Sequence, residues 1–144
     1  MILIDLNVVL DVFQAREPHY QASAKLLDLV VDRQVKGVIS AHAVTTIHYL
    51  VSRYRNGTDA NEAVEWLIRY FEIATIGRDQ LLRAQSLRWG DFEDAVVAAA
   101  AESSKCGFII TRNIKDFSGA PVPVLTPDEY LATLDAVLNS RSSK

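Results

Sequence analysis

Residues 91–117 read DFEDAVVAAAAESSKCGFIITRNIKDF, and this stretch decides the fold class. Its first half opens with acids and continues as an alanine-rich run, which predicts a helix that approaches a sheet closely. GFIIT then follows as a short apolar run, typical of a strand buried on both faces. Residues 1–5, MILID, have the same character. In both places polar residues follow where the buried strand ends.

Outward from this stretch, short apolar runs alternate with segments of helical spacing. The predicted strands are MILID, VKGVIS, FEIATI, GFIIT and PVPVL. The predicted helices cover residues 19–34, 43–55, 59–70 and 79–87, one that starts at or near Asp91, and one that opens with a Thr126–Glu129 capping box. Asn56-Gly57 is expected to end the helix before it. The order predicts a single-domain, three-layer α/β/α fold with a parallel sheet of about 4–5 strands.

The composition sets limits on function. The chain has 144 residues with 15 basic and 18 acidic side chains, a net charge of −3, so either nucleic acid is not the partner or another group supplies positive charge. The single Cys106 excludes an internal disulfide and fits a reducing cytoplasm. No leader or membrane span is expected. Residues 1–135 are expected to form the domain, and residues 136–144 a disordered tail.

Oxygen-bearing side chains converge at one edge of the predicted sheet. Strand ends and helix N-termini share the carboxyl edge of a parallel sheet, where ligands bind in this architecture. The residues placed there are Asp5, Asn7, Asp91, Asp94, Asn113 and Asp116. Such a set, without paired His or Cys, favours a hard cation such as Mg²⁺ or Mn²⁺.

Each of these residues also has a purely structural interpretation. Asp91 and Asp94 are suited to capping a helix, and Asn7 and Asn113 to forming turns. Asp5 is different, because an acid at the end of a buried strand needs a partner that offsets its desolvation. The three histidines do not form a zinc site, because His42 and His48 lie on different faces of a helix and His19 is in another segment.

The chain resembles the PIN-domain family, in particular the VapC-like toxins of bacterial and archaeal toxin–antitoxin pairs. The resemblance covers roughly residues 1–131. It is carried by the motifs ILIDLNVVLDVF, REPHYQASAKLL, VISAHAVTTIHYLV, DFEDAVVAAAAE, FIITRNIKDF and PVLTPDEYL, in this order. It implies a Mg²⁺- or Mn²⁺-dependent endoribonuclease with RNA as substrate, a cognate antitoxin as partner, no membrane association, and a homodimer.

The resemblance also assigns residues. It implies catalytic roles for Asp5, Asp94 and Asp116, and a metal site formed by Asp5, Asp94, Asp91 and Asp116. Two departures from the family pattern stand out: Asn113 occupies the position of the last acid, and Thr46 that of a helical Glu. One metal ion is therefore expected rather than two. Asn7, Thr46, Thr111 and Asn113 are expected to orient the substrate.

Other functions remain in competition. A phosphoaspartate phosphatase needs Asp-x-Asp after the first strand, and this chain has Asp5-Leu6-Asn7. A receiver domain needs an acidic pair there, which is also missing. The main alternative is a catalytically weakened PIN-like module that binds RNA or protein, because Thr46 replaces the expected Glu. Local positive charge for RNA is expected from Arg53, Arg55, Arg112 and Lys115.

Overall fold

A parallel sheet of five strands forms the centre of the computed structural model, which describes residues 1–142. The strand order is β3-β2-β1-β4-β5, so the first strand lies in the middle. Ile2 pairs with Gly37 on one side and with Phe108 on the other. The strands are β1 (Ile2–Ile4), β2 (Gly37–Ser40), β3 (Glu72–Ala74), β4 (Phe108–Ile110) and β5 (Val124–Leu125).

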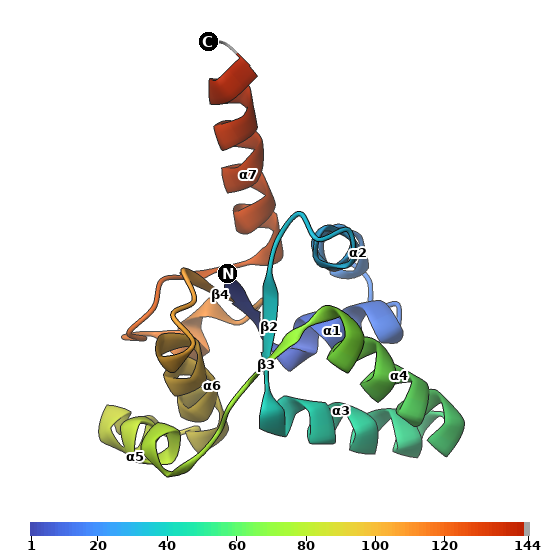
Figure 1. Ribbon diagram of the computed structural model, residues 1–144, viewed down its shortest axis with the longest axis vertical. Coiled ribbons are helices and arrows are strands. Elements are labelled where there is room, and N and C mark those ends of the chain that lie inside the picture. Colours follow the sequence, from blue (N-terminus) through green and yellow to red (C-terminus); the bar gives the residue numbers. More distant parts are fainter. Residues whose placement is uncertain (143–144) are drawn as a thin grey trace.

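Helices cover both faces of this sheet (Figure 1). They are α1 (Leu6–Phe13), α2 (Tyr20–Val31), α3 (Ala41–Tyr54), α4 (Gly57–Tyr70), α5 (Arg78–Leu87), α6 (Phe92–Ser103), the 3₁₀ helix η1 (Ile114–Phe117), and α7 (Pro127–Ser142). Helices α1 to α4 lie on one side of the sheet, and α5 and α6 on the other. The predicted three-layer fold is confirmed.

Successive strand residues point into two separate cores. Ile2 and Ile4 of β1 pack into the core formed with α1 to α4, whereas Leu3 packs into the core formed with α6. This follows from the two-residue repeat of a strand. Because both faces are covered, every residue of β1 is buried, which is why its sequence is apolar without alternation.

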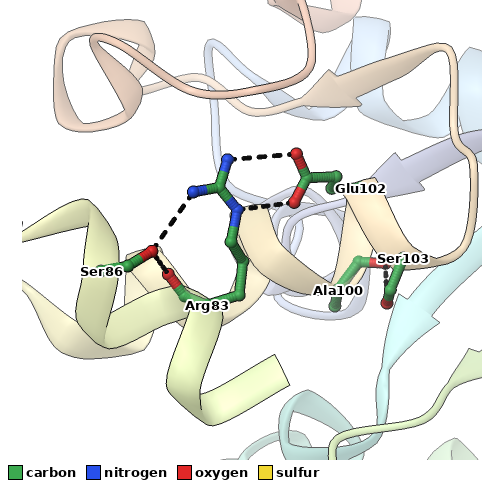
Figure 2. A network of polar contacts seen from close by, with 5 residues as sticks. All are labelled: Arg83, Ser86, Ala100, Glu102 and Ser103. Carbon is green, nitrogen blue, oxygen red and sulfur yellow. Dashed lines mark hydrogen bonds and ion pairs between the residues drawn. The ribbon is translucent and has the colours of Figure 1, made fainter. Parts of the chain in front are cut away.

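The alanine-rich helix α6 is held firmly beside the sheet. Residues 95–101 are all buried, and their small side chains let the helix lie close to the strands. Figure 2 shows the guanidinium of Arg83, on α5, facing the carboxylate of Glu102 near the C-terminal end of α6. Arg83 Nε lies 2.8 Å from Glu102 Oε1, and Arg83 Nη2 lies 3.2 Å from Oε2. The Arg83 side chain also reaches the hydroxyl of Ser86, at 3.2 Å. These contacts connect α5 to the C-terminal end of α6, whose first turn carries Asp94.

The observed boundaries correct the sequence prediction in two places. Helix α1 was not predicted, because its eight residues follow β1 without any intervening turn. Asn56 does not end a helix: its side chain accepts a hydrogen bond from the backbone N–H of Asp59 at 2.7 Å and so caps the start of α4. The predicted Thr126–Glu129 capping box is confirmed, with reciprocal bonds of 3.0 and 3.1 Å.

Helix α7 extends away from the rest of the domain (Figure 1). Its beginning is anchored by Tyr130, which is buried, and by Leu134, which packs on the core beneath α2. The helix continues through residues 136–142, where the sequence predicted a disordered tail. The last two residues of that predicted tail lie outside the described residues. Within residues 1–142, no helix is both long and apolar enough to cross a membrane.

Candidate active site

Asp5 lies at the carboxyl end of the central strand and is almost entirely buried, with 6% of its surface exposed. Its backbone N–H donates to the carbonyl of Ile110 at 2.9 Å, which continues the pairing of β1 with β4. One residue further along, the hydroxyl of Thr111 donates to Asp5 Oδ2 at 2.9 Å. Parallel pairing therefore places the acid and its donor side by side, although they are far apart in sequence.

Two opposing effects act on the pKa of Asp5, and the effect of burial is the larger. Burial raises the pKa of its carboxyl group above the usual value, since desolvation disfavours the charged form. The hydrogen bond from Thr111 acts in the opposite direction and stabilises the carboxylate. A second bond arranges the loop around this donor: the backbone N–H of Asn113 donates to the Thr111 hydroxyl oxygen at 3.1 Å.

Asp94 lies in the first turn of α6, close to several other acids. Asp91 occupies the N-cap position, and its Oδ1 accepts from the backbone N–H of Asp94 at 3.1 Å. Burial, and then the charges of neighbouring carboxylates, raise the pKa of Asp94 to about 7. The carboxylates that contribute are, in decreasing order of effect, those of Asp91, Asp5, Asp116 and Glu93. The three predicted segments therefore come together.

A pocket of about 330 Å³ opens beside these acids. Asp91, Asp94 and Asp116 line it, together with Lys115 and Trp89. Asp116 belongs to the 3₁₀ helix η1 and is exposed to solvent, whereas Asp5 lies beneath the surface. The arrangement offers an accessible group of carboxylates above a buried one. A larger cavity of about 710 Å³ lies elsewhere, between α1, α3 and α4, and contains none of these four acids.

The predicted substrate-orienting residues have different surroundings. Thr111 is fully buried and bonded to Asp5, whereas Asn113 is exposed. Asn7 is half-buried in the first turn of α1. The hydroxyl of Thr46 donates to the carbonyl of His42 one turn earlier in its own helix, at 3.2 Å, so this bond ties it to its own helix.

Comparison with known proteins identifies the domain. The family model described as PIN domain matches residues 1–115. The chain belongs to the PIN-domain family. A toxin–antitoxin complex from Klebsiella pneumoniae contains a chain of similar structure, with 26% identity, a TM-score of 0.68, and coverage of 88% of this chain and 98% of that one. No curated protein sequence matches significantly.

More distant solved structures share the fold of this PIN domain. VapBC2 from Rickettsia felis, bound to a DNA fragment from its promoter, is similar at 18% identity and a TM-score of 0.65, covering 88% of this chain and 98% of that one. VapC20 from Mycobacterium tuberculosis, a toxin that cleaves the sarcin–ricin loop, is similar at 16% identity and a TM-score of 0.60, covering 76% and 87%.

The site residues fit a cation by charge and chemistry. Burial, and then the charges of four neighbouring carboxylates, raise the pKa of Asp94 to about 7, and a divalent ion would offset this local excess of negative charge. Their oxygens are the donors that hard cations prefer. Within residues 1–142, however, no three His, Cys, Asp or Glu side chains are arranged as a ready ligand set.

The sequence analysis did not assign site roles to two residues at the edge of this region. Glu93 belongs to the same acidic run and contributes to raising the pKa of both Asp5 and Asp94. His42 Nε2 lies 3.9 Å from Glu93 Oε1, and burial lowers the pKa of its imidazole. Glu93 was visible in the DFED motif, but its proximity to His42 depends on how α3 and α6 meet, which no local pattern shows.

Proposed function

We propose that this PIN domain is a divalent-metal-dependent endoribonuclease that hydrolyses phosphodiester bonds of RNA and acts as the toxin of a toxin–antitoxin pair. The observation that carries the proposal is that acids from three separate segments gather at the carboxyl edge of a parallel sheet, where substrates bind in such folds. Burial and the charges of the neighbouring acids together raise the pKa of Asp94 to about 7, as is common at functional sites. PIN-domain nucleases generally use divalent metal ions, and this acidic cluster is suited to one.

Each acid has a proposed role in this activity. Asp5, at the end of β1, and Asp94, in the first turn of α6, would hold one Mg²⁺ or Mn²⁺ ion. Asp116 and Asp91, which line the open pocket, contribute through water or accept a proton from the attacking water. When bound, the ion supplies Lewis-acid chemistry, acidifying water and stabilising negative charge on the phosphoryl oxygens.

The neutral residues keep these acids in place. The hydroxyl of Thr111 donates to Asp5, and the backbone N–H of Asn113 donates to the Thr111 hydroxyl. Such donors orient a ligand and keep it ionised. Asn7 and Thr46 remain proposed substrate-orienting groups. Because a cation bridges protein and phosphate, the net charge of −3 is compatible with an RNA substrate.

The proposed partners are RNA, a cognate antitoxin and a second copy of the chain. Similarity to a chain of a toxin–antitoxin complex, covering 88% of this protein, supports an antitoxin. The homodimer is supported by aromatic exposure on α3, where Tyr49 and Tyr54 are 58% and 68% exposed. The proposed location is the cytoplasm, where the RNA substrates are.

A second function has specific support. Thr46 stands where the family has a Glu, and residues 1–142 contain no ready group of three metal ligands. Both features fit a weakened domain that binds RNA or protein without cleaving. The two functions differ in whether RNA is cleaved or only bound.

One experiment decides between them. The purified chain is incubated with single-stranded RNA in Mg²⁺ or Mn²⁺, and in parallel with EDTA. The proposal expects cleavage with metal and none with EDTA. RNA binding without cleavage in either metal supports the binding module, and cleavage that persists in EDTA contradicts the metal-dependent mechanism.

A further inference from the structure

A second buried acid lies outside the acidic site. Asp11 of α1 is 0% exposed, although it carries a carboxylate. Two arginines approach it: Arg112 Nε lies 3.4 Å from Oδ2 and Arg16 Nη1 lies 3.9 Å from Oδ1. Ser23 is close enough to lower the pKa of Asp11, but no hydrogen bond with complete geometry reaches either oxygen. The Asp11 carboxylate is therefore stabilised mainly by the positive charges of neighbouring side chains.

A buried carboxylate of this kind is destabilising unless cations lie close to it. Burial raises the pKa of Asp11, and Arg112 is the largest of the influences that lower it again. Removing water from a carboxylate is costly unless a cation compensates. The Arg112–Asp11 contact is therefore the main stabilisation of an otherwise unfavourable buried charge, and it fixes the position of the Arg112 side chain.

Arg112 also belongs to the loop that supports the active site. It follows Thr111, the donor to Asp5, and its charge lowers the pKa of Asp5. Two side-chain interactions therefore join the end of β4 to β1 and α1: the hydrogen bond from Thr111 to Asp5 and the ion pair of Arg112 with Asp11. Arg112 is thereby a cation near Asp5 whose Nε faces Asp11 and not the acids of the candidate site.

Part of the Arg112 side chain remains open to solvent. It is 25% exposed, and its Nε lies 3.4 Å from Asp11 Oδ2 without hydrogen-bond geometry. A guanidinium carries its other N–H groups in the same plane, which suits two-point binding of a phosphate.

We propose that Arg112 binds a phosphate of the RNA beside the acidic site, and that Asp11 is the positioning residue that holds the guanidinium there. This inference rests on the proposed ribonuclease function and adds the group that binds the substrate backbone.

The test combines cleavage kinetics with RNA binding. Arg112→Met, Arg112→Lys and a control, Arg69→Met, are compared with the wild type on one single-stranded RNA oligonucleotide. Arg69 lies over the ring of Tyr70 at the opposite edge of the sheet, so its replacement removes the same charge away from the site. KM and kcat are measured in Mg²⁺ or Mn²⁺, and the RNA Kd is measured in EDTA over a range of salt concentrations.

The expected pattern is specific to a phosphate contact. Arg112→Met raises KM and Kd by about tenfold or more, because a charge-assisted bond is lost. It also lowers the slope of log K against log salt by about 0.7, the value for one contact to single-stranded nucleic acid. Arg112→Lys restores the slope but only part of the affinity, and Arg69→Met resembles the wild type. A merely structural role for Arg112 would not change the salt slope.

Asp11→Asn tests the positioning role. The variant keeps the side-chain volume and removes the charge, so KM and Kd rise severalfold while the terminal groups of Arg112 lose their fixed orientation. In the double variant with Arg112→Met, the Asp11 change adds no further loss of RNA affinity, because both changes remove one interaction. Arg112→Met leaves the buried Asp11 without its main cation, so should it or Asp11→Asn fail to fold, Arg112→Lys, which keeps the charge, decides by its RNA affinity relative to the wild type.

Several outcomes overturn the inference. The phosphate contact is contradicted if Arg112→Met has the KM, the RNA Kd and the salt slope of the wild type. It is also contradicted if Arg69→Met loses as much RNA affinity as Arg112→Met. If the wild type binds RNA but does not cleave it, the ribonuclease proposal fails while the binding comparison still decides the role of Arg112. If the wild type neither binds nor cleaves RNA, both proposals are wrong.

Discussion

The hydroxyl of Thr111 donates to Oδ2 of Asp5 at 2.9 Å, joining two buried side chains that are 106 positions apart in the sequence. The bond spans the boundary between the central strands β1 and β4, at the edge where each strand ends. It compensates part of the desolvation of Asp5 and fixes the carboxylate in one orientation. The candidate site is therefore built on paired strands, which are more rigid than loops.

Replacing Thr111 with Val should destabilise the protein. The two side chains have the same shape, but Val leaves the buried Asp5 carboxylate without its donor. We expect the free energy of unfolding at neutral pH to fall by about 1–3 kcal/mol, measured by urea denaturation. Thr111→Ser keeps the hydroxyl and should lose less. A Val variant as stable as the wild type would show that the bond contributes nothing.

The pKa of Asp94 predicts how stability depends on pH in the absence of metal. Its folded value, about 7, lies above the ordinary value of 3.8, so the folded protein retains a proton that the unfolded chain releases. Stability attributable to this group is therefore highest below pH 3.8 and is lost as the pH rises towards 7. In EDTA, Asp94→Asn should melt close to the wild type near pH 4 and on the order of several degrees higher near pH 8.

The difference in melting temperature between the wild type and Asp94→Asn reports on Asp94 alone, because the other titrating groups are present in both proteins. A constant difference in melting temperature between pH 4 and pH 8 would mean that Asp94 titrates normally and that the carboxylates do not gather as described. Added Mg²⁺ or Mn²⁺ should stabilise the wild type at pH 8, because an ion that binds the folded state selectively shifts the equilibrium towards it.

Asp91 serves mainly as a helix cap, and its variants should show this. Asn caps a helix as well as Asp does, so Asp91→Asn should change stability by less than about 0.5 kcal/mol, whereas Asp91→Ala should lose about 1 kcal/mol. If Asp91 contributes to the metal site only through water, Asp91→Asn should retain more cleavage than Asp94→Asn. Urea denaturation and initial cleavage rates test the two parts separately, and a collapse of cleavage in Asp91→Asn would make Asp91 a direct ligand.

The exposed aromatics of α3 predict a homodimer. Five aromatic residues lie in or next to α3 and α4: Tyr49, Tyr54, Trp66, Tyr70 and Phe71. The structure buries Phe71 and leaves Tyr49 and Tyr54 largely exposed on one helix. We expect light scattering to give the mass of a dimer at about tens of micromolar, and Tyr54→Glu to give a monomer. The matched control Leu138→Ser, an equally exposed apolar residue on α7, should remain dimeric, and a monomeric wild type would contradict the interface.

Much of this architecture was predictable because local and global signals agree. The strands β1 (ILI) and β4 (FII) are apolar throughout since both faces of the sheet are covered, and Thr126 and Glu129 form the capping box their spacing indicates. Helix α1 was missed because no turn separates it from β1. Asn56 was misassigned because the same residue type suits the end of one helix and the start of the next.

The acidic site was only partly predictable. Parallel topology brings Asp5, Asp94 and Asp116 to one edge, and that follows from the order of strands and helices. The buried charge of Asp11 did not follow, because an acid in an amphipathic helix is ordinarily exposed. Its contact with Arg112 depends on side-chain packing between α1 and the end of β4, which no sequence spacing encodes.

Cleavage of RNA by purified Asp94→Asn tests the central claim most directly. The substitution keeps the size of the side chain and removes one negative charge from the proposed cation site. We predict that metal-dependent cleavage falls by at least about a hundredfold, while the melting temperature in EDTA is held or raised because repulsion from Asp91 and Asp5 is relieved. Cleavage at the wild-type rate by a well-folded Asp94→Asn protein would contradict the proposed active site and leave Asp94 a residue of the helix start alone.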